Sequence, residues 1–180
     1  MSFDQAFART VGAEGGFSDN AADPGGNTNW GITERVARAH GYQGAMKDMP
    51  IAKAKEIYKS GYWDLIHLGE VDKISPLIAI EMFDTAVNCG VTVPVSFVQR
   101  ALNALNRRGK DYPDHAVDGL FGAVTAESLR QFMVRRGAAG EKVVLALLNS
   151  EQGVRYLEIV EKREASEDFL FGWVANRVAV

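Results

Sequence analysis

The residues that could do chemistry gather between Glu14 and Thr33, in the sequence EGGFSDNAADPGGNTNWGIT. This stretch places Glu14 before two glycines, a second carboxylic acid, Asp23, beside a Pro-Gly-Gly turn, and a hydroxyl at Thr28. A carboxyl group that keeps its proton near neutral pH can act as a general acid, and nearby polar groups can assist it. The three side chains together predict acid–base chemistry.

Glu14 follows a predicted N-terminal helix. Residues 2–5 form a capping box, and Phe3 and Phe7 recur at helical spacing. Glu14 lies about three turns after Phe3, so both side chains leave the same apolar face. The glycines at 15–16 can end the helix, which places Glu14 in its last turn, near the negative end of the dipole. Burial and the dipole both favour the protonated acid. The alternative is an ordinary glutamate at a fraying helix end.

A turn and a short strand are predicted after the glycine pair. Pro24 presets one backbone angle and the two glycines after it accept positive φ, so Asp-Pro-Gly-Gly predicts a turn, and residues 27–32 predict a strand. A helix followed by a hairpin would return Asp23 and Thr28 towards Glu14. The alternative for Asp23 is a turn residue whose carboxylate satisfies its own backbone.

The runs EGG, DPGG and GIT, with Thr28 between the last two, resemble the signature of the phage and prophage N-acetylmuramidases of glycoside hydrolase family 108, in the lysozyme-like superfamily. Glu14, Asp23 and Thr28 also resemble the Glu, Asp and Thr set of phage-type lysozymes. Family members often read Asn-Asp-Pro where this chain reads Asp-Asn-Ala at residues 19–21. Asp23 is therefore the better second acid.

The resemblance implies hydrolysis of the β-1,4 bond between N-acetylmuramic acid and N-acetylglucosamine. Glu14 would protonate the leaving oxygen, Asp23 would orient a water or stabilise the transition state, and Thr28 would hold that water. Analogy with phage lysozymes favours inversion. A lytic transglycosylase, which needs the acid but no second carboxylate, is one alternative. A non-catalytic wall-binding or tail-associated structural protein is the other.

Two aromatic residues near this stretch are candidates for substrate binding. The indole of Trp30 and the ring of Tyr62 have the flat apolar faces on which sugars stack. Tyr62 could equally anchor the core. Trp63, beside it, is expected to be a core residue.

The segment from Leu77 to Val87 predicts the most apolar helix, buried on nearly all sides and opened by Ser-Pro. Glu81, Asp84 and Asn88 recur on it at three- and four-residue spacing, so they form a polar stripe facing either solvent or a polar cleft. The phrase FDTAVNCG resembles the muramidase helix that backs the active site, which implies a sugar contact for Asn88. Capping the helix before Gly90 is the competing use of this asparagine.

The C-terminal half predicts more helices. An amphipathic helix over residues 94–105 precedes a loop at 106–114 that is a candidate subdomain boundary. The run VDGLFGAVTAESLRQF, with Thr125 as a helix cap, resembles the three-helix peptidoglycan-binding modules of many relatives; the alternative is extra helices that complete the lobe. Three further helices are expected, at residues 141–150, 153–163 and 166–178.

These elements predict a mainly α, lysozyme-like α+β fold. A small N-terminal lobe with a short β-hairpin after the catalytic helix would pack on a larger all-helical lobe. Residues 1–93 would form the catalytic region, and residues 94–180 a peptidoglycan-binding-like region closely packed on it.

Composition limits the other possibilities. The 180 residues are 47 % hydrophobic with a formal charge of −3, which fits a compact globular protein without a general basic surface for nucleic acid or anionic lipid. The single cysteine, Cys89, lies in an apolar helical run and is expected to be a small core residue. The sequence has no His-Glu-x-x-His or cysteine-pair motif, so neither a metal nor a cofactor is expected.

The N-terminus lacks the pattern of a signal peptide, and the longest apolar runs are too short to cross a bilayer. Synthesis in the cytoplasm without stable membrane insertion is therefore expected. The resemblance implies that this is the cytoplasm of a bacterial host, and a monomer is expected. The resemblance implies a phage or prophage endolysin that a holin or another route exports to the periplasm, where it degrades peptidoglycan.

Overall fold

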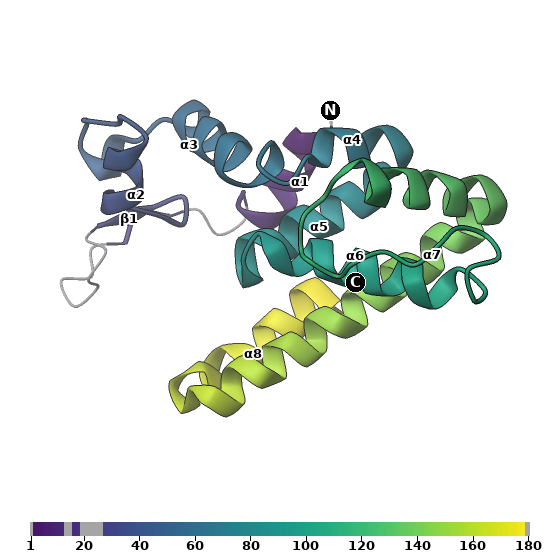
Figure 1. Ribbon diagram of the computed structural model, residues 1–180. Coiled ribbons are helices and arrows are strands. Elements are labelled where there is room, and N and C mark those ends of the chain that lie inside the picture. Colours follow the sequence, from purple (N-terminus) through teal and green to yellow (C-terminus); the bar gives the residue numbers. More distant parts are fainter. Residues whose placement is uncertain (1, 13–15, 19–26, 179–180) are drawn as a thin grey trace. The chain divides into compact units, whose positions relative to one another are not determined.

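The computed structural model describes residues 2–12, 16–18 and 27–178, and most of them are helical (Figure 1). The chain divides into two compact units, Met1–Leu65 and Ile66–Val180. The prediction of a mainly α fold with a short hairpin after the first helix is confirmed.

The first unit begins with α1 (Ser2–Thr10), whose buried face carries Ala6 and Phe7. A small antiparallel sheet follows, in which β1 (Thr28–Asn29) pairs with β2 (Ile32–Thr33). The remaining elements are α2 (Glu34–Ala39), a 3-10 turn η1 (Met46–Asp48), α3 (Ile51–Tyr58) and a π-helical turn η2 (Lys59–Trp63). Thr33 caps α2, because its side chain accepts a hydrogen bond from the Val36 amide.

The single strand predicted over residues 27–32 is wrong. Trp30 and Gly31 take φ values of 53° and 72° and form the two-residue turn of a hairpin. Positive φ at both central residues is the conformation of a type I′ turn, which suits glycine but is uncommon for tryptophan. Before this hairpin, Ser18 and Thr28 exchange both backbone hydrogen bonds in an antiparallel bridge, so the chain has reversed direction between them.

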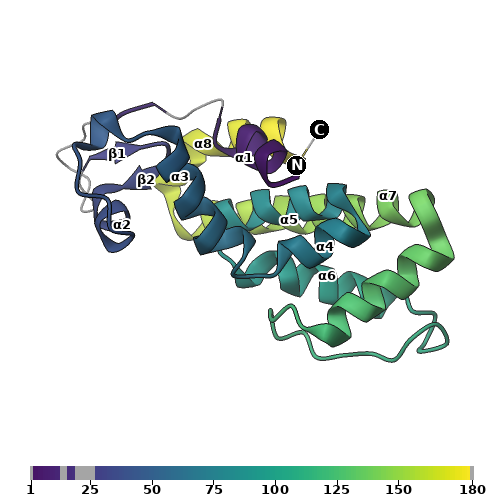
Figure 2. The same ribbon diagram turned by 90° about the horizontal axis from the view of Figure 1, so that it is seen from above.

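The second unit is helical throughout its regular structure. It comprises α4 (Leu68–Ile74), α5 (Pro76–Cys89), α6 (Thr92–Leu105), α7 (Ala123–Lys162), a 3-10 turn η3 (Glu164–Ser166), α8 (Glu167–Trp173) and a π-helical turn η4 (Val174–Val178). Helix α5 contacts α4, α6 and α7 and is the central helix of the unit (Figure 2). Ser75 caps it as predicted, but Leu77, which was assigned to its buried surface, is 53 % exposed, whereas Ile78 beside it is fully buried.

Helix α7 departs most from the predicted elements. Gly137 has φ 53° and ψ −146°, which separates two helical arms, whereas the predicted break before Gly153 is absent because that residue continues the helix. Gly140 also lies inside the helix, where an added Cβ would meet the Phe132 ring at 2.9 Å. Thr125 is not the cap: the helix starts at Ala123, with Gly122 before it.

The C-terminal elements run back along the second arm of α7 (Figure 1). The helix predicted over residues 166–178 is present as α8 followed by η4. Trp173 contacts Tyr156 of α7, with ring centroids 5.3 Å apart. These contacts complete the second unit.

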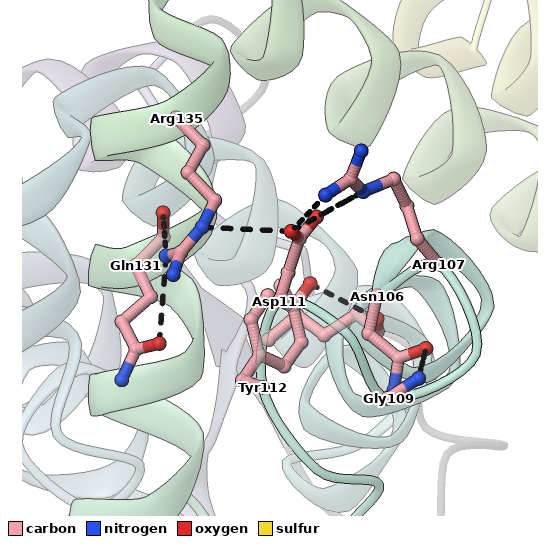
Figure 3. Close-up of polar contacts among 8 residues, drawn as sticks. Asn106, Arg107, Gly109, Asp111, Tyr112, Gln131 and Arg135 are labelled. Atoms are coloured by element: carbon pink, nitrogen blue, oxygen red, sulfur yellow. Dashed lines mark hydrogen bonds and ion pairs between the residues drawn. The ribbon is translucent and has the colours of Figure 1, made fainter.

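A long loop, residues 106–122, joins α6 to α7. It lies within the second unit, so the predicted subdomain boundary there is not supported by the contacts. Arg107 forms a two-pronged ion pair with Asp111, which also lies 3.6 Å from Arg135 of α7 (Figure 3). The hydroxyl of Tyr112 donates to the carbonyl of Leu102 at 3.0 Å. The loop is therefore fixed to the helices on both sides.

Candidate active site

Glu14 and Asp23 lie outside the described residues, so their predicted catalytic roles remain predictions. The helix that leads to Glu14 is described and ends at Thr10, earlier than the glycine pair at which the sequence predicts its end. The Val11 and Gly12 amides both donate to the carbonyl of Phe7, at 2.8 and 3.1 Å. The Val11 amide follows the regular i→i−4 pattern, but the Gly12 amide bonds to a carbonyl five residues back. This change at Gly12 closes the helix before residues 15–16.

Thr28, the third predicted catalytic residue, lies on β1 and is half-buried. Its neighbour Asn29 is 5 % exposed, and the Asn29 side-chain amide donates to the carbonyl of Met46 at 2.7 Å. Successive side chains of a strand point to opposite faces, so an inward Asn29 directs Thr28 to the other face. Together with the bridge to Ser18, this bond fixes the position of Thr28.

Trp30 occupies the positive-φ position of the hairpin and is held from two sides. Its indole N–H donates to the carbonyl of Met49 at 3.0 Å, and its own carbonyl accepts from the Tyr58 hydroxyl at 3.0 Å. Beside it, a Cβ on Gly31 would lie 2.8 Å from that hydroxyl, which leaves room for glycine alone. The polar edge of the indole is thus used structurally. The sugar-binding role of Trp30 remains a prediction.

Tyr58 connects the parts of this region, and the sequence analysis did not single it out. Besides holding Trp30, it packs edge-on against Phe7 of α1 and stacks on Tyr62, with both pairs of ring centroids 5.5 Å apart. Its hydroxyl is buried, which raises its pKa well above the usual range, so it stays a hydrogen-bond donor. The available signal was the four-residue spacing from Tyr62, which predicts contact on one helix face.

Tyr62 and Trp63 differ in burial. Trp63 is 4 % exposed and packs edge-on against Phe3, so its predicted core role is confirmed. Tyr62 is half-buried on η2, and burial raises the pKa of its phenol. One ring face contacts Tyr58, and its role in binding sugar remains a prediction.

Asn88 belongs to the second unit. Its side-chain amide donates to the carbonyl of Asp84 at 2.8 Å, one turn earlier on α5, and the helix ends at Gly90 with φ 100°. The polar stripe to which it was assigned is largely internal: Glu81 and Asp84 are 3 % and 2 % exposed. Asp84 accepts a hydrogen bond from Gln152 and lies 3.7 Å from Arg177. Whether Asn88 contacts sugar remains a prediction.

Cys89 follows on the same helix. It is half-buried rather than fully buried, and burial raises the pKa of its thiol to about 11. The thiolate is the reactive form, so this side chain is unreactive at neutral pH.

Across residues 2–12, 16–18 and 27–178, no group of three acidic, histidine or cysteine side chains is placed to hold a metal ion. Within those same ranges, no helix has the length and apolarity required to span a membrane.

Two known protein families match successive parts of the sequence. Residues 7–90 match the family described as Glycosyl hydrolase 108, and residues 93–178 match the family described as Predicted Peptidoglycan domain. The two matches follow one another along the chain, with only residues 91–92 between them. The first matched region contains Glu14, Asp23 and Thr28, so all three predicted catalytic positions fall in the hydrolase part.

A solved structure has the same fold. The structure of SagA from Brucella abortus is similar over 99 % of this chain and 90 % of its own, with 24 % identity and a TM-score of 0.64. No curated protein matches the chain significantly. The two family matches support a peptidoglycan-degrading enzyme of the glycoside hydrolase type.

The matched regions and the contact units divide the chain differently. The two family matches meet between α5 and α6. The two compact units, in contrast, meet between Leu65 and Ile66. The reason is that α5, at the end of the hydrolase match, packs on α6 and α7 of the second match. The predicted division after residue 93 remains a prediction.

Proposed function

We propose that the protein is an N-acetylmuramidase that hydrolyses the β-1,4 bond between N-acetylmuramic acid and N-acetylglucosamine. The observation that carries this proposal is the hydrolase match over residues 7–90, which includes two carboxylic acids and a threonine at the spacing of phage-type lysozymes. The bonds that hold Thr28 and the hairpin support it, because a catalytic hydroxyl needs a fixed position.

In this proposal Glu14 donates its proton to the leaving glycosidic oxygen. Asp23 is ionised and either orients the attacking water or stabilises the oxocarbenium-like transition state, and Thr28 holds the water. The aromatic rings of Trp30 and Tyr62 and the amide of Asn88 contact the sugars. The outcome is inversion, with a water molecule between the sugar and the second carboxylate.

The second part of the proposal concerns binding to the bacterial cell wall. Residues 93–178 bind peptidoglycan and keep the catalytic region near its polymeric substrate, which raises the effective concentration of cleavable bonds. The biological setting is lysis from within, by a phage or prophage endolysin that leaves the host cytoplasm through a holin or another route and acts as a monomer in the periplasm.

Product analysis tests the chemistry. Purified Gram-negative sacculi are digested with the full chain, and the fragments are identified by mass spectrometry. Hydrolysis by a muramidase gives new reducing ends on N-acetylmuramic acid. Ends with 1,6-anhydro-muramic acid would instead identify a lytic transglycosylase, and reducing ends on N-acetylglucosamine would identify cleavage of the other bond. No products at all would favour a non-catalytic wall-binding protein.

The proposed role of Asp23 is tested by a separate substitution. Asp23→Asn is expected to lose most of the activity, because a neutral amide cannot stabilise positive charge on the sugar. Glu56→Gln, on the exposed surface of α3, serves as the control and keeps the activity of the parent. Equal rates for Asp23→Asn and the parent would remove Asp23 from the mechanism.

A further inference from the structure

The second unit contains a hollow of about 570 Å³ between α4 and the start of α7. His67 and Glu70 line it on the α4 side, Phe121 and Gly122 precede α7, and Ala126, Glu127 and Arg130 line it along that helix. A hollow of this size accommodates a ligand of several residues. Of the residues assigned to substrate or catalysis above, the four that the structure describes, Thr28, Trp30, Tyr62 and Asn88, do not line it.

Small or buried residues form the apolar part of the lining. Phe121 is 7 % exposed, and Ala126 presents only a methyl group. A Cβ added to Gly122 would meet nothing within 4 Å, so the backbone there borders open space. The hollow is therefore kept open by residue size, while its apolar surface remains available for a ligand.

Charged side chains of both signs surround this apolar surface. Arg130 pairs with Glu127 on α7, and the two side chains are 52 % and 53 % exposed, so both reach solvent and a ligand. Glu70 stands on the α4 side and pairs with Lys73 at 2.7 Å. The hydrogen bond and charge of Lys73 chiefly, and the charges of Arg130 and His67 more weakly, lower the pKa of Glu70. Glu70 and Arg130 line the same hollow from its two sides.

The charged side chains around the hollow suit the peptide stems of peptidoglycan better than its glycan strands. Its glycan strands carry hydroxyl and amide groups and are bound mainly by exposed aromatic faces, but the aromatic residue of this hollow, Phe121, is buried. Its peptide stems carry free amino and carboxyl groups and also the small methyl side chains of alanine. A guanidinium such as Arg130 suits a carboxylate, and the carboxylates of Glu70 and Glu127 suit an ammonium group.

We infer that the hollow binds the peptide stem of peptidoglycan, with Arg130 as the contact for a stem carboxylate and Glu70 and Glu127 as contacts for a stem amine. This inference rests on the proposed function, since it names the part of the wall that the second half of the chain recognises. The catalytic region then cleaves glycan while the hollow holds the peptides that branch from it.

The test titrates the full chain with the free tetrapeptide cut from Gram-negative peptidoglycan, followed by calorimetry or NMR. Arg130→Gln and Glu70→Gln are expected to weaken binding about fivefold each, as for loss of one exposed charge contact. Ala126→Leu, which keeps a good helix former and places a larger apolar side chain in the lining of the hollow, is expected to weaken binding. Binding should also weaken as salt is raised.

Arg100→Gln is the matched control, because Arg100 is 57 % exposed and also belongs to an ion pair, with Glu151, but does not line the hollow. It should bind the tetrapeptide like the parent. N-acetyl-tetra-alanine amide, which has methyl side chains but neither a free amine nor a free carboxylate, tests the charge contacts and should bind more weakly. Equal affinity for the two peptides, no binding of the wall tetrapeptide, or equal affinities of the Arg130 and Arg100 variants would overturn the inference.

Failure of this inference is distinguishable from failure of the proposed function. A chain that cleaves glycan but does not bind the tetrapeptide would contradict the inference alone. A chain that binds the tetrapeptide but releases no fragments from sacculi would contradict the hydrolase proposal alone.

Discussion

Two buried tyrosines make the same hydrogen bond in the two units. The hydroxyl of Tyr58 donates to the carbonyl of Trp30, and the hydroxyl of Tyr112 donates to the carbonyl of Leu102, each at 3.0 Å. The two side chains are 5 % and 4 % exposed. Trp30, whose carbonyl accepts the first bond, has positive φ, and so do residues 107–109, which lie between Leu102 and Tyr112 in the sequence.

The bonds differ in what they hold. Tyr58 fixes the turn of the hairpin that carries Thr28, a proposed catalytic residue. Tyr112 belongs to a loop that Asp111 and its two arginine partners also fix, far along the chain from the proposed catalytic residues (Figure 3). The same interaction should therefore affect catalysis in the first unit and stability alone in the second. Substitutions can test this difference.

The largest effect on stability is expected at Gln99, which is 1 % exposed on α6. Its amide donates to Asp118 and Leu120, and its oxygen accepts from the amides of Asp118 and Gly119 at 3.0 Å each. Gln99→Leu leaves two buried amides without their acceptor and should cost about 3 kcal/mol in the free energy of unfolding. Thermal unfolding followed by circular dichroism measures the loss.

Gln131→Leu is the control for this prediction, because Gln131 bonds only to neighbours on its own helix, Glu127 and Arg135, at the surface. Its stability should stay within about 0.5 kcal/mol of the parent. If Gln99→Leu were as stable as Gln131→Leu, the buried network would contribute nothing to the second unit.

The next effect separates the two tyrosines. Tyr58→Phe and Tyr112→Phe should each lose about 1–2 kcal/mol of stability, because each leaves a carbonyl without its donor. Only Tyr58→Phe should slow the release of fragments from sacculi, by about tenfold, since a shift of the hairpin misplaces Thr28. Equal rates for both variants under conditions where both are folded would show that the hairpin does not position the catalytic groups.

The smallest effect is a dependence on pH in the loop of the second unit. The hydrogen bond from Arg107, assisted by the charges of Arg107 and Arg135, lowers the pKa of Asp111 below its ordinary value of 3.8. A lowered pKa contributes stability above the ordinary value, and this contribution is lost as pH falls through the lowered value.

Asp111→Asn should therefore melt below the parent at neutral pH, and the gap in melting temperature should close as the solution is acidified below the ordinary pKa. Asp168→Asn is the control, because Asp168 forms no ion pair among the residues that the structure describes. Its melting temperature is compared with that of the parent over the same pH range. A gap for Asp111→Asn that persists in acid would mean that its carboxylate acts by shape and not by charge.

Short-range sequence patterns predicted the elements that depend on neighbouring residues in the chain. Ser75 caps α5, because a hydroxyl before an apolar run acts within three residues. The turn at Trp30 was missed, since tryptophan is no turn residue and its positive φ depends on distant partners, Met49 and Tyr58. Which glycine interrupts a helix was also not predictable: Gly137 adopts positive φ, and Gly153 does not.

The candidate site shows the same limit. Thr28 was placed on a strand from its surroundings, but the end of the first helix at Thr10 was not foreseen, because it depends on which carbonyl the Gly12 amide selects. Gln99 was overlooked although it lies four residues after Val95 and three before Leu102, on the buried face. A polar residue at an apolar position was the available signal.

The most direct test of the account is the rate at which Glu14→Gln releases reducing ends from purified sacculi. The side chain keeps its size but has no proton to donate, so the rate should fall by about a hundredfold or more, with an unchanged circular dichroism spectrum. A rate equal to that of the parent would contradict the assignment of Glu14 as the general acid, on which the proposed function depends.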